Sequence, residues 1–215
     1  MGKAQCAQHV GLCWVRRYRS FAQPTIIEKI CRLGYRLRNP TNWWVYTDRR
    51  MSIHLNPDNY LEISISMQRL DIIDHDKVIK SFPVSTAKNG PGEKMGSECT
   101  PTGWHRIRAR IGEGEHLNSV FIGRRPTGEI YTTELGKQFP DRDWILTRIL
   151  WLGGLEPGRN RYGSVDSSWR YIYIHGCPDD LVNGKPESHG CIRMKNADVI
   201  ELFNYVIVGT YVFIH

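Results

Sequence analysis

The sequence predicts a mainly β protein, a β sandwich or barrel, with one helix close to its C-terminal end. Two observations predict this fold class. Many short apolar runs are separated by turn signals, of which Asn89-Gly90-Pro91-Gly92 and Glu156-Pro157-Gly158 are the clearest, and this spacing is typical of sandwiches and barrels. In addition, one stretch after residue 195 has its apolar residues at helical spacing, which indicates a helix.

Eight segments are predicted to be strands. The clearest is Leu61–Met67, where apolar and polar residues alternate with period 2, as expected of a strand with one buried face. The others are, in chain order, Lys77–Val84, Trp104–Ile111, Val120–Ile122, Ile130–Thr133, Ile145–Leu152, Trp169–His175 and Thr210–Ile214. Two intervening segments, Asn89–Cys99 and Glu134–Arg142, are long enough to be loops over a site.

The helix is predicted from its caps as well as from its periodicity. Asn196 is a favourable N-cap residue, and Asp198 would lie in the first turn, where it complements the helix dipole. Gly209 supplies the stop signal. The apolar positions at helical spacing are Ala197, Ile200, Phe203, Val206 and Ile207.

Composition excludes several classes of protein. The 215 residues are 40% hydrophobic and 24% charged, which fits a globular domain and excludes disordered, collagen-like and coiled-coil proteins. No apolar run approaches the roughly 20 residues that a bilayer-spanning helix needs. We therefore expect a soluble protein with no membrane partner.

The net charge of +7 would favour binding to nucleic acid or to a membrane surface, but the charge is confined to one region. Residues 1–50 hold ten Lys and Arg residues against two acidic residues, and residues 51–215 are close to neutral. We therefore expect a basic extension at 1–50 and one domain at 51–215, with no nucleic-acid partner. The extension has three interpretations: a basic arm, an unusual export peptide, or upstream sequence translated from a wrongly chosen start codon. We favour the last, because Met51 opens directly onto a strand pattern.

The residues that carry chemistry lie in two nearby segments. An apolar run ends in His175-Gly176-Cys177, and ten residues later comes Ser188-His189-Gly190-Cys191. A cysteine paired with a histidine from a neighbouring segment provides the nucleophile and the base of an acyl-transfer enzyme. A glycine beside the nucleophile allows backbone N–H groups to approach a reacting carbonyl, as an oxyanion hole requires.

Two other interpretations use the same side chains. The two His-Gly-Cys sequences could ligate zinc, but ligand pairs in zinc sites are usually separated by two to four residues rather than one; we expect neither a metal nor another cofactor. Alternatively, the cysteines are packed in the core and the histidines have their hydrogen bonds satisfied within the protein, since free cysteine is among the most buried residue types. By the same argument Cys99 is expected to be unreactive, and the tryptophans to belong to the core.

These segments resemble the signature of the YkuD-type L,D-transpeptidase family, in which His-Gly is followed by Ser-His-Gly-Cys-Ile-Arg. Thr100-Pro101-Thr102-Gly103 is similar to the Thr-Pro-x-Gly turn of that family. The resemblance covers about residues 51–215. It implies the β-rich catalytic fold of the family, with one helix after the cysteine motif, and a cysteine that attacks peptidoglycan stem peptides.

The resemblance also implies a role for each matching residue. Cys191 would be the nucleophile and His175 the general base. Gly176 and Ser188 would orient the site, and the N–H groups around Gly190 and Cys191 would form the oxyanion hole.

Three further residues are candidates with weaker signals. His189 matches a motif position and is grouped with the residues that orient the site. Arg193 also matches the motif and would bind a substrate carboxylate, because a guanidinium holds carboxylates in bidentate fashion; the alternative is a structural ion pair. Arg148 is a second carboxylate candidate, whose alternative is a solvated strand face.

Pairing with histidine can lower a thiol pKa from about 8.5 into the range of roughly 3.5–7.5, so we expect a thiolate at Cys191 at neutral pH. Its thioester would react with water, giving an L,D-carboxypeptidase, or with a second stem, giving an L,D-transpeptidase. The chain shows no convincing export signal, and Cys177 could form a disulfide with the nucleophile in an oxidising compartment. We therefore expect a cytoplasmic carboxypeptidase of cell-wall recycling acting on muropeptides, with a periplasmic or envelope transpeptidase as the alternative.

Overall fold

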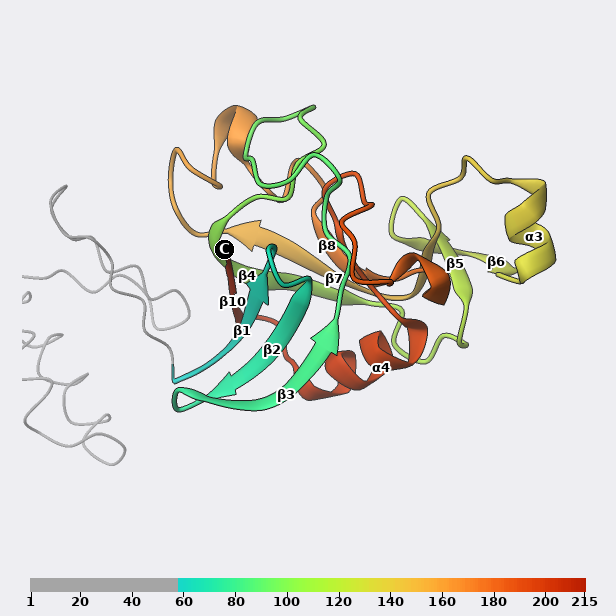
Figure 1. The fold of residues 1–215 in the computed structure, drawn as a ribbon, viewed down its shortest axis with the longest axis horizontal. Helices are drawn as coiled ribbons and strands as arrows, with labels where there is room; N and C mark the ends of the chain where they lie inside the picture. The colour runs from blue at the N-terminus through green and yellow to red at the C-terminus, as the bar shows by residue number, and fades with distance from the viewer. Residues whose placement is uncertain (1–57) are drawn as a thin grey trace, which may run out of the picture. The chain divides into compact units, whose positions relative to one another are not determined.

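The computed structural model describes residues 58–215 (Figure 1). The predictions about residues 1–50 and about a boundary at Met51 lie outside the described residues. The strands are β1 Asn59–Ser64, β2 Arg69–Asp74, β3 Lys77–Pro83, β4 Gly103–Ile111, β5 Ser119–Ile122, β6 Arg125–Ile130, β7 Ile145–Gly154, β8 Tyr173–Gly176, β9 Ile192–Met194 and β10 Tyr211–Ile214. The α-helices are α3 Thr133–Gln138 and α4 Asn196–Tyr205, and short 3₁₀ helices are η1 Gly163–Val165 and η2 Asp179–Leu181.

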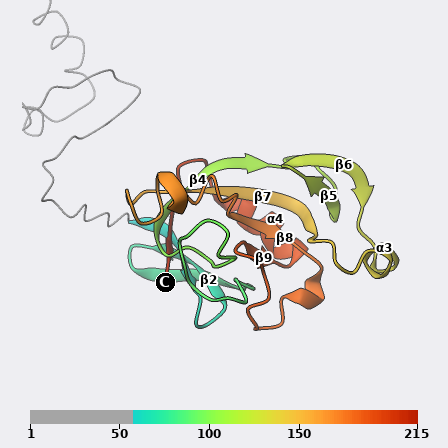
Figure 2. The same cartoon turned by 90° about the horizontal axis from the view of Figure 1, so that it is seen from above.

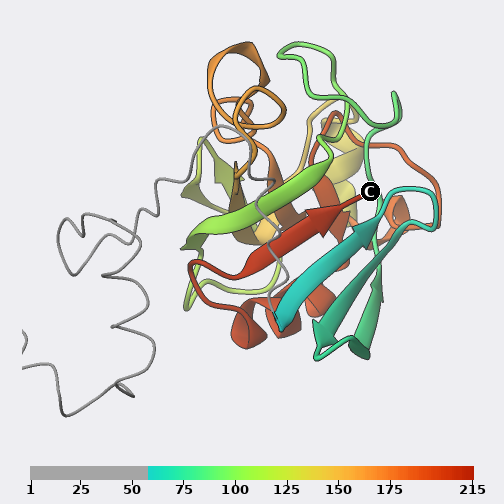
Figure 3. The ribbon, with the colours of Figure 1, turned by 90° about the vertical axis from the view of Figure 1, so that its left-hand side faces the viewer.

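The ten strands of the described residues form one mixed sheet. Its main path has the order β3-β2-β1-β10-β4-β7-β5-β6, and β8 pairs with both β7 and β9. The β1–β10 and β8–β9 pairs are parallel, whereas the other pairs are antiparallel. Figure 3 shows the C-terminal strand β10 lying between β1 and β4. The prediction of a mainly β fold whose main helix follows the cysteine motif is confirmed.

One face of the sheet is closed by helix α4 (Figure 1). The helix buries Val199, Leu202 and Phe203 against Leu150 of β7 and Ile174 of β8, within the largest apolar cluster of the described residues. Burying each such side chain stabilises the fold by about 1.5–3 kcal/mol. This apolar layer makes β7 and β8 a rigid platform for whatever lies on their other face.

The opposite face carries a smaller apolar cluster of Phe121, Ile149 and Tyr173. Trp151 and Cys191 are partly buried against it. Because side chains alternate along a strand, the residues of β8 divide between the two faces. Ile174 belongs to the core under α4, and its neighbours on both sides, among them Tyr173, face the smaller cluster.

Strand β7 changes partners along its length. Its first residues, Ile145 and Leu146, pair with β5, and the segment from Ile149 to Gly154 pairs with β4. Strand β8 also pairs with β7, and this register shifts between Leu146 and Ile149, where Thr147 has a φ of 66°. Since Leu146 pairs with both β5 and β8, the β5–β6 hairpin lies at the same end of β7 as β8, which is side by side with β9 in Figure 2.

Several predicted boundaries are wrong for identifiable reasons. Trp169–His175 is a strand only from Tyr173, because Tyr171 has a φ of 56° in a turn. The strand predicted at Ile130–Thr133 ends at Ile130, since the Thr132 Oγ1 accepts a hydrogen bond from the Leu135 N–H and starts α3. The predicted loop Glu134–Arg142 therefore begins as a helix. The strands β2 and β9 are absent from the prediction.

The prediction that Asn196 caps the main helix is also wrong. The N-cap is Lys195, and Asn196 is the first helical residue, with a buried side chain. Its backbone N–H donates instead to the carboxylate of Asp179, at 2.9 Å. Of the predicted apolar face, Ala197 and Ile207 are exposed. The buried apolar residues of the helix are Val199, Leu202 and Phe203.

Candidate active site

The parallel pairing of β8 with β9 places the two motif segments side by side. In this register Ile174 lies opposite Ile192, and His175 lies opposite Arg193. Cys191 directly precedes Ile192, so it follows the alternation onto the face that His175 occupies. The two are diagonal neighbours across adjacent strands, a position in which Cα atoms are about 7–8 Å apart. The structure thus brings Cys191 and His175 together.

The hydrogen bond of the His175 ring defines which nitrogen can act as a base. Nδ1 lies 2.8 Å from the carbonyl oxygen of Gly176. A carbonyl can only accept, so Nδ1 carries the hydrogen and Nε2 holds the lone pair of the neutral ring. Nε2 is buried and has no hydrogen-bond partner within the described residues. A buried polar atom without a partner is unusual in folded proteins, and here it is the atom that a general base requires.

Burial keeps the His175 ring neutral. Loss of solvation lowers the pKa of His175, and the nearby carboxylate of Asp143 opposes this effect only in part. The ring is fully buried. It is therefore available as a base at neutral pH.

The Cys191 thiol is also neutral in this environment. Burial raises the pKa of Cys191 to about 12, although a backbone hydrogen bond from Tyr173 and the positive charges of Arg193 and Arg170 act in the opposite direction. Its Sγ donates to the carbonyl of Tyr171 at 3.4 Å. The structure therefore favours a neutral thiol beside a neutral imidazole, in place of the thiolate expected from pairing with histidine. The proton would move as the sulfur attacks.

Ser188 holds the loop that presents the thiol. Its Oγ donates to the Cys191 carbonyl at 2.5 Å and accepts from the Gly190 N–H at 3.2 Å. Its backbone N–H donates to the carbonyl of Thr86. The Gly190 N–H thus has a partner in this hydroxyl, and the oxyanion hole formed by the N–H groups around Gly190 and Cys191 stays a prediction.

Gly190 occupies a position that other residues would not tolerate. Its φ is 126°, and a Cβ atom there would lie 3.2 Å from the carbonyl oxygen of Cys99. The hydroxyl of Thr100 donates to the Gly190 carbonyl at 3.0 Å and accepts from the Ala87 N–H at 2.9 Å. The Thr-Pro-x-Gly turn thus positions the cysteine loop through its threonine.

Gly176 provides close packing at the end of β8. A Cβ atom there would lie 2.6 Å from Oδ1 of Asn196 and 2.7 Å from the carbonyl oxygen of Leu146. Glycine therefore lets the chain carry the carbonyl that fixes the His175 ring.

Arg193 is engaged in an ion pair. Its Nη2 lies 2.6 Å from Oδ1 of Asp143, and its Nη1 donates to the Glu187 carbonyl at 3.1 Å. Although burial works to raise it, the pKa of Asp143 lies below its usual value, because the Arg193 guanidinium brings a positive charge and donates a hydrogen bond to its carboxylate. Asp143 is thus a site residue that the sequence analysis missed, because it lies outside the motif in the loop before β7. Arg193 thus has a structural role in the ion pair with Asp143, and its role in binding a substrate carboxylate stays a prediction.

The remaining two candidates occupy different environments. His189 is exposed at the rim of the cysteine loop. Arg148 donates through Nη1 to the carbonyls of Glu115 and Thr147, at 2.8 and 2.6 Å, and lies over the ring of Phe203 in helix α4. The structure therefore does not bring Arg148 to the face that carries Cys191.

Two loops border the site. Arg170 donates to the carbonyls of Gly92 and Cys99 at 3.0 and 2.6 Å, which ties it to the predicted loop 89–99. The same loop is bound to the segment that contains η1, because the Met95 N–H donates to the Ser164 carbonyl at 2.7 Å. These two loops are therefore connected to each other by hydrogen bonds.

The zinc alternative receives no support from the positions of its ligands. Cys177 is fully buried, and its Sγ donates to the carbonyls of Pro178 and Met194. Between residues 58 and 215, no group of three or more His, Cys, Asp or Glu side chains is arranged to hold a metal ion.

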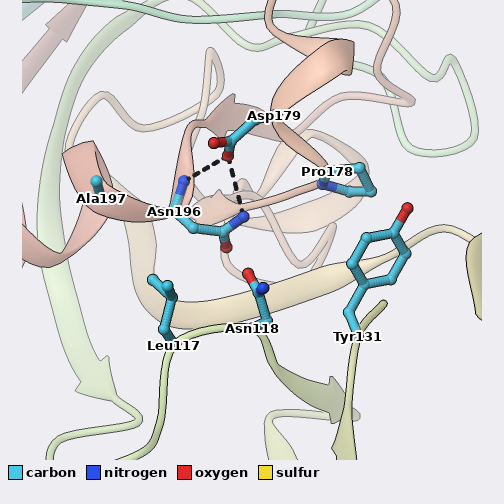
Figure 4. Close-up of a pocket in the computed structure, with 7 residues that line it drawn as sticks. All are labelled: Leu117, Asn118, Tyr131, Pro178, Asp179, Asn196 and Ala197. Atoms are coloured by element: carbon cyan, nitrogen blue, oxygen red, sulfur yellow. Dashed lines mark hydrogen bonds between the residues drawn. The ribbon is translucent and has the colours of Figure 1, made fainter. Parts of the chain in front are cut away.

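A pocket of about 200 Å³ lies near the far end of β8 (Figure 4). In its wall, Asn196 donates to the carboxylate of Asp179 and to the carbonyl of Cys177. The pocket is lined by Leu117, Asn118, Tyr131, Pro178, Asp179, Asn196 and Ala197. Since neither Cys191 nor His175 belongs to this lining, the pocket is separate from the candidate active site.

One comparison with known proteins identifies a family. A family model described as the L,D-transpeptidase catalytic domain (YkuD) matches residues 58–214. A search of curated proteins gave no significant match.

In residues 58–215, no helix is long and apolar enough to cross a membrane.

Solved structures of L,D-transpeptidases resemble the chain at low sequence identity. One from Xylanimonas cellulosilytica is 18% identical, with 80% of this chain and 65% of that chain covered and a TM-score of 0.44. One from Mycobacterium smegmatis is 16% identical, with 74% and 58% covered and a TM-score of 0.45. L,D-transpeptidase 3 from Mycobacterium tuberculosis, in complex with a faropenem-derived adduct, is 16% identical, with 74% and 60% covered and a TM-score of 0.44. The chain therefore spans about three fifths of the length of these proteins.

Proposed function

Because this chain belongs to the YkuD family of L,D-transpeptidase catalytic domains, we propose that it is an L,D-carboxypeptidase that removes the terminal D-alanine from peptidoglycan tetrapeptide stems. It carries the catalytic domain of a cysteine-dependent acyl-transfer enzyme. The single observation that carries the assignment of roles is the free Nε2 of His175, buried on the same sheet face as Cys191.

The first half of the reaction forms a thioester. Sγ of Cys191 attacks the carbonyl that joins the third stem residue to D-alanine, and its proton passes to Nε2 of His175. As the C–N bond breaks, Nε2–H donates that proton to the leaving amine. A positioned acid–base group of this kind contributes about 10² to 10⁴ to the rate. The Gly176 carbonyl stabilises the transient imidazolium through its hydrogen bond with Nδ1.

The second half of the reaction uses water. Nε2 of His175 takes a proton from water, the hydroxide oxygen adds to the thioester carbon, and the C–S bond breaks. Cys191 recovers its proton, and the products are a tripeptide carboxylate and free D-alanine. An amine of a second stem could replace water and would give a cross-link, which is the alternative function.

Two arguments favour hydrolysis in the cytoplasm. Hydrolysis needs only one bound peptide, whereas cross-linking needs a second stem seated beside the thioester. The catalytic thiol must also stay reduced, and the three cysteines of the described residues, Cys99, Cys177 and Cys191, are all unpaired. Cytosolic thiols are kept reduced, whereas exported proteins form disulfides. The substrate would then be a muropeptide released during cell-wall turnover.

The test incubates the purified full-length chain with a disaccharide-tetrapeptide, using the Cys191→Ala variant as control, and follows products by mass spectrometry. We expect loss of one alanine without dimer. Dimer formation would replace the carboxypeptidase by the transpeptidase. Equal activity in the Cys191→Ala variant, or no reaction of the wild type, would contradict the proposal.

A further inference from the structure

An arginine stands at an unusual backbone position in the β5–β6 hairpin. The turn between Ile122 and Arg125 has only two residues, Gly123 and Arg124, with φ values of 56° and 67°. A two-residue turn with both φ values positive favours Gly, Asn or Asp, because a Cβ atom is strained there. Such departures from local preference concentrate at functional sites.

The Arg124 guanidinium is held in place by aromatic side chains. Its Nη1 donates to the hydroxyl of Tyr173 at 2.9 Å. Its Cζ lies 4.5 Å from the ring centre of Trp151 and 5.1 Å from that of Tyr171. Trp151 is itself fixed, because its Nε1–H donates to the Ser168 carbonyl at 3.2 Å. The cation is therefore oriented before any ligand arrives.

This cation has no acidic partner within residues 58–215. The carboxylates of the described residues that pair with arginine contact Arg69, Arg142, Arg159 and Arg193. One of the five N–H groups of the Arg124 guanidinium is used by Tyr173. The remaining donors match the planar, two-oxygen geometry of a carboxylate.

The guanidinium is also close to the reacting sulfur. Tyr171, whose ring it covers, accepts the hydrogen bond of the Cys191 thiol through its carbonyl. Tyr173, its hydrogen-bond partner, belongs to the apolar cluster against which Cys191 packs. A peptide whose carbonyl sits at Sγ would therefore bring its neighbouring charged groups to Arg124.

We propose that Arg124 is a substrate-binding residue that holds a carboxylate of the stem peptide next to the bond that Cys191 attacks. The inference rests on the proposed function, because it supplies the substrate determinant of that same site. Next to that bond the carboxylate has two sources: the terminal D-alanine, and the side chain of the diamino acid before it. The test distinguishes these sources.

The experiment compares the wild type with Arg124→Gln on three peptides. One is the disaccharide-tetrapeptide, the second has its terminal carboxylate amidated, and the third has the diamino-acid carboxylate amidated. Arg124→Gln should lower kcat/KM for the unmodified peptide about 10- to 100-fold, as expected for loss of a hydrogen bond to a charged group. For the peptide that lacks the bound carboxylate, wild type and variant should be equal, and that peptide identifies the source.

Arg108→Gln is the matched control, since Arg108 lies over the same Trp151 ring at 4.7 Å but is tied to the Ser168 hydroxyl. It should leave the ratio between peptides unchanged. Equal losses for all three peptides in Arg124→Gln, or no loss, would overturn the inference.

Binding of the same peptides to Cys191→Ala, with and without Arg124→Gln, tests the inference without turnover. Arg124→Gln should weaken binding of the unmodified peptide and leave binding of one amidated peptide unchanged, whereas equal affinities throughout overturn the inference. If instead the wild type turns over every peptide but Arg124→Gln changes nothing, the proposed function stands and only the role of Arg124 fails.

Discussion

Two segments of this chain have the same three residues, His-Gly-Cys, at 175–177 and at 189–191, yet the fold treats them in opposite ways. In the first, both the histidine and the cysteine are fully buried. In the second, the histidine is exposed and the cysteine is half-buried. The candidate active site takes its base from the first segment and its nucleophile from the second.

The difference shows that position on the sheet decides how buried each side chain is and which groups it contacts. Cys177 follows the end of β8 and donates its thiol hydrogen to the carbonyls of Pro178 and Met194. Cys191 precedes β9 and lies on the face opposite α4, where the Nε2 of His175 is free. Identical sequence therefore gives one fully buried thiol and one partly exposed thiol, and we assign the reaction to the second.

Removing each thiol in turn gives the largest expected difference between the two segments. Cys191→Ala should abolish turnover of the tetrapeptide, with a loss on the order of 10⁴ or more, because the nucleophile is gone. Cys177→Ala removes a thiol that faces only carbonyl groups and should keep most of the activity. The measurement is kcat for release of alanine. A comparable loss in both variants would contradict the division of roles.

The histidines give the next largest contrast. His175→Asn should lower kcat about 10²- to 10⁴-fold through loss of the general base. His189→Asn, at an exposed position, should change kcat little. Circular dichroism of both variants checks that the fold is intact. A larger loss for His189→Asn would move the base to the second segment.

The pH dependence of Cys191 alkylation by iodoacetamide tests whether this thiol is neutral near pH 7. Burial raises the pKa of this thiol to about 12, and only the thiolate reacts. Below that pKa the thiolate fraction rises with pH, so the rate should increase about tenfold per pH unit between pH 7 and 10. Mass spectrometry of the labelled peptide gives the rate. A rate that is already constant above pH 6 would instead indicate a thiolate–imidazolium pair.

Gly176→Ala tests the packing behind His175 and has the smallest expected effect. The new methyl group would lie 2.6 Å from Oδ1 of Asn196, and overpacking of this kind typically costs about 1–3 kcal/mol. The free energy of unfolding from urea titration measures this cost. Gly153→Ala, at a strand glycine where a new methyl group would approach Arg108 no closer than 3.8 Å, is the matched control for adding a methyl group without overpacking. Equal destabilisation by both would mean that Gly176 has no packing role.

The sequence predicted the elements that local patterns specify. The alternation of apolar and polar residues from Leu61 predicts β1, and the apolar run before His175 predicts β8. Strand β9 is absent from the prediction, because Ile192–Met194 is three residues long and is defined by its pairing with β8 and with Ser85. A strand held by a distant partner leaves little trace in its own sequence.

Most candidate site residues that the sequence predicts lie in one motif. Cys191, His175 and Ser188 belong to it, whereas Asp143 and Arg124 come from segments that reach the site only through long-range contacts. The sequence predicts a local cap at Asn196, but the partners of its amide are Thr147, Cys177 and Asp179, all 17 or more residues away. Long-range contacts of this kind cannot be read from spacing.

The central claim is that Cys191 carries the acyl group, and intact-protein mass spectrometry during turnover tests it most directly. The protein is mixed with disaccharide-tetrapeptide and quenched in acid, which preserves a thioester, and the modified peptide is then sequenced. We expect an adduct of the substrate minus alanine on Cys191, present also in Cys177→Ala and absent from Cys191→Ala. An adduct on Cys177 or Cys99, or turnover by the Cys191→Ala variant, would contradict it.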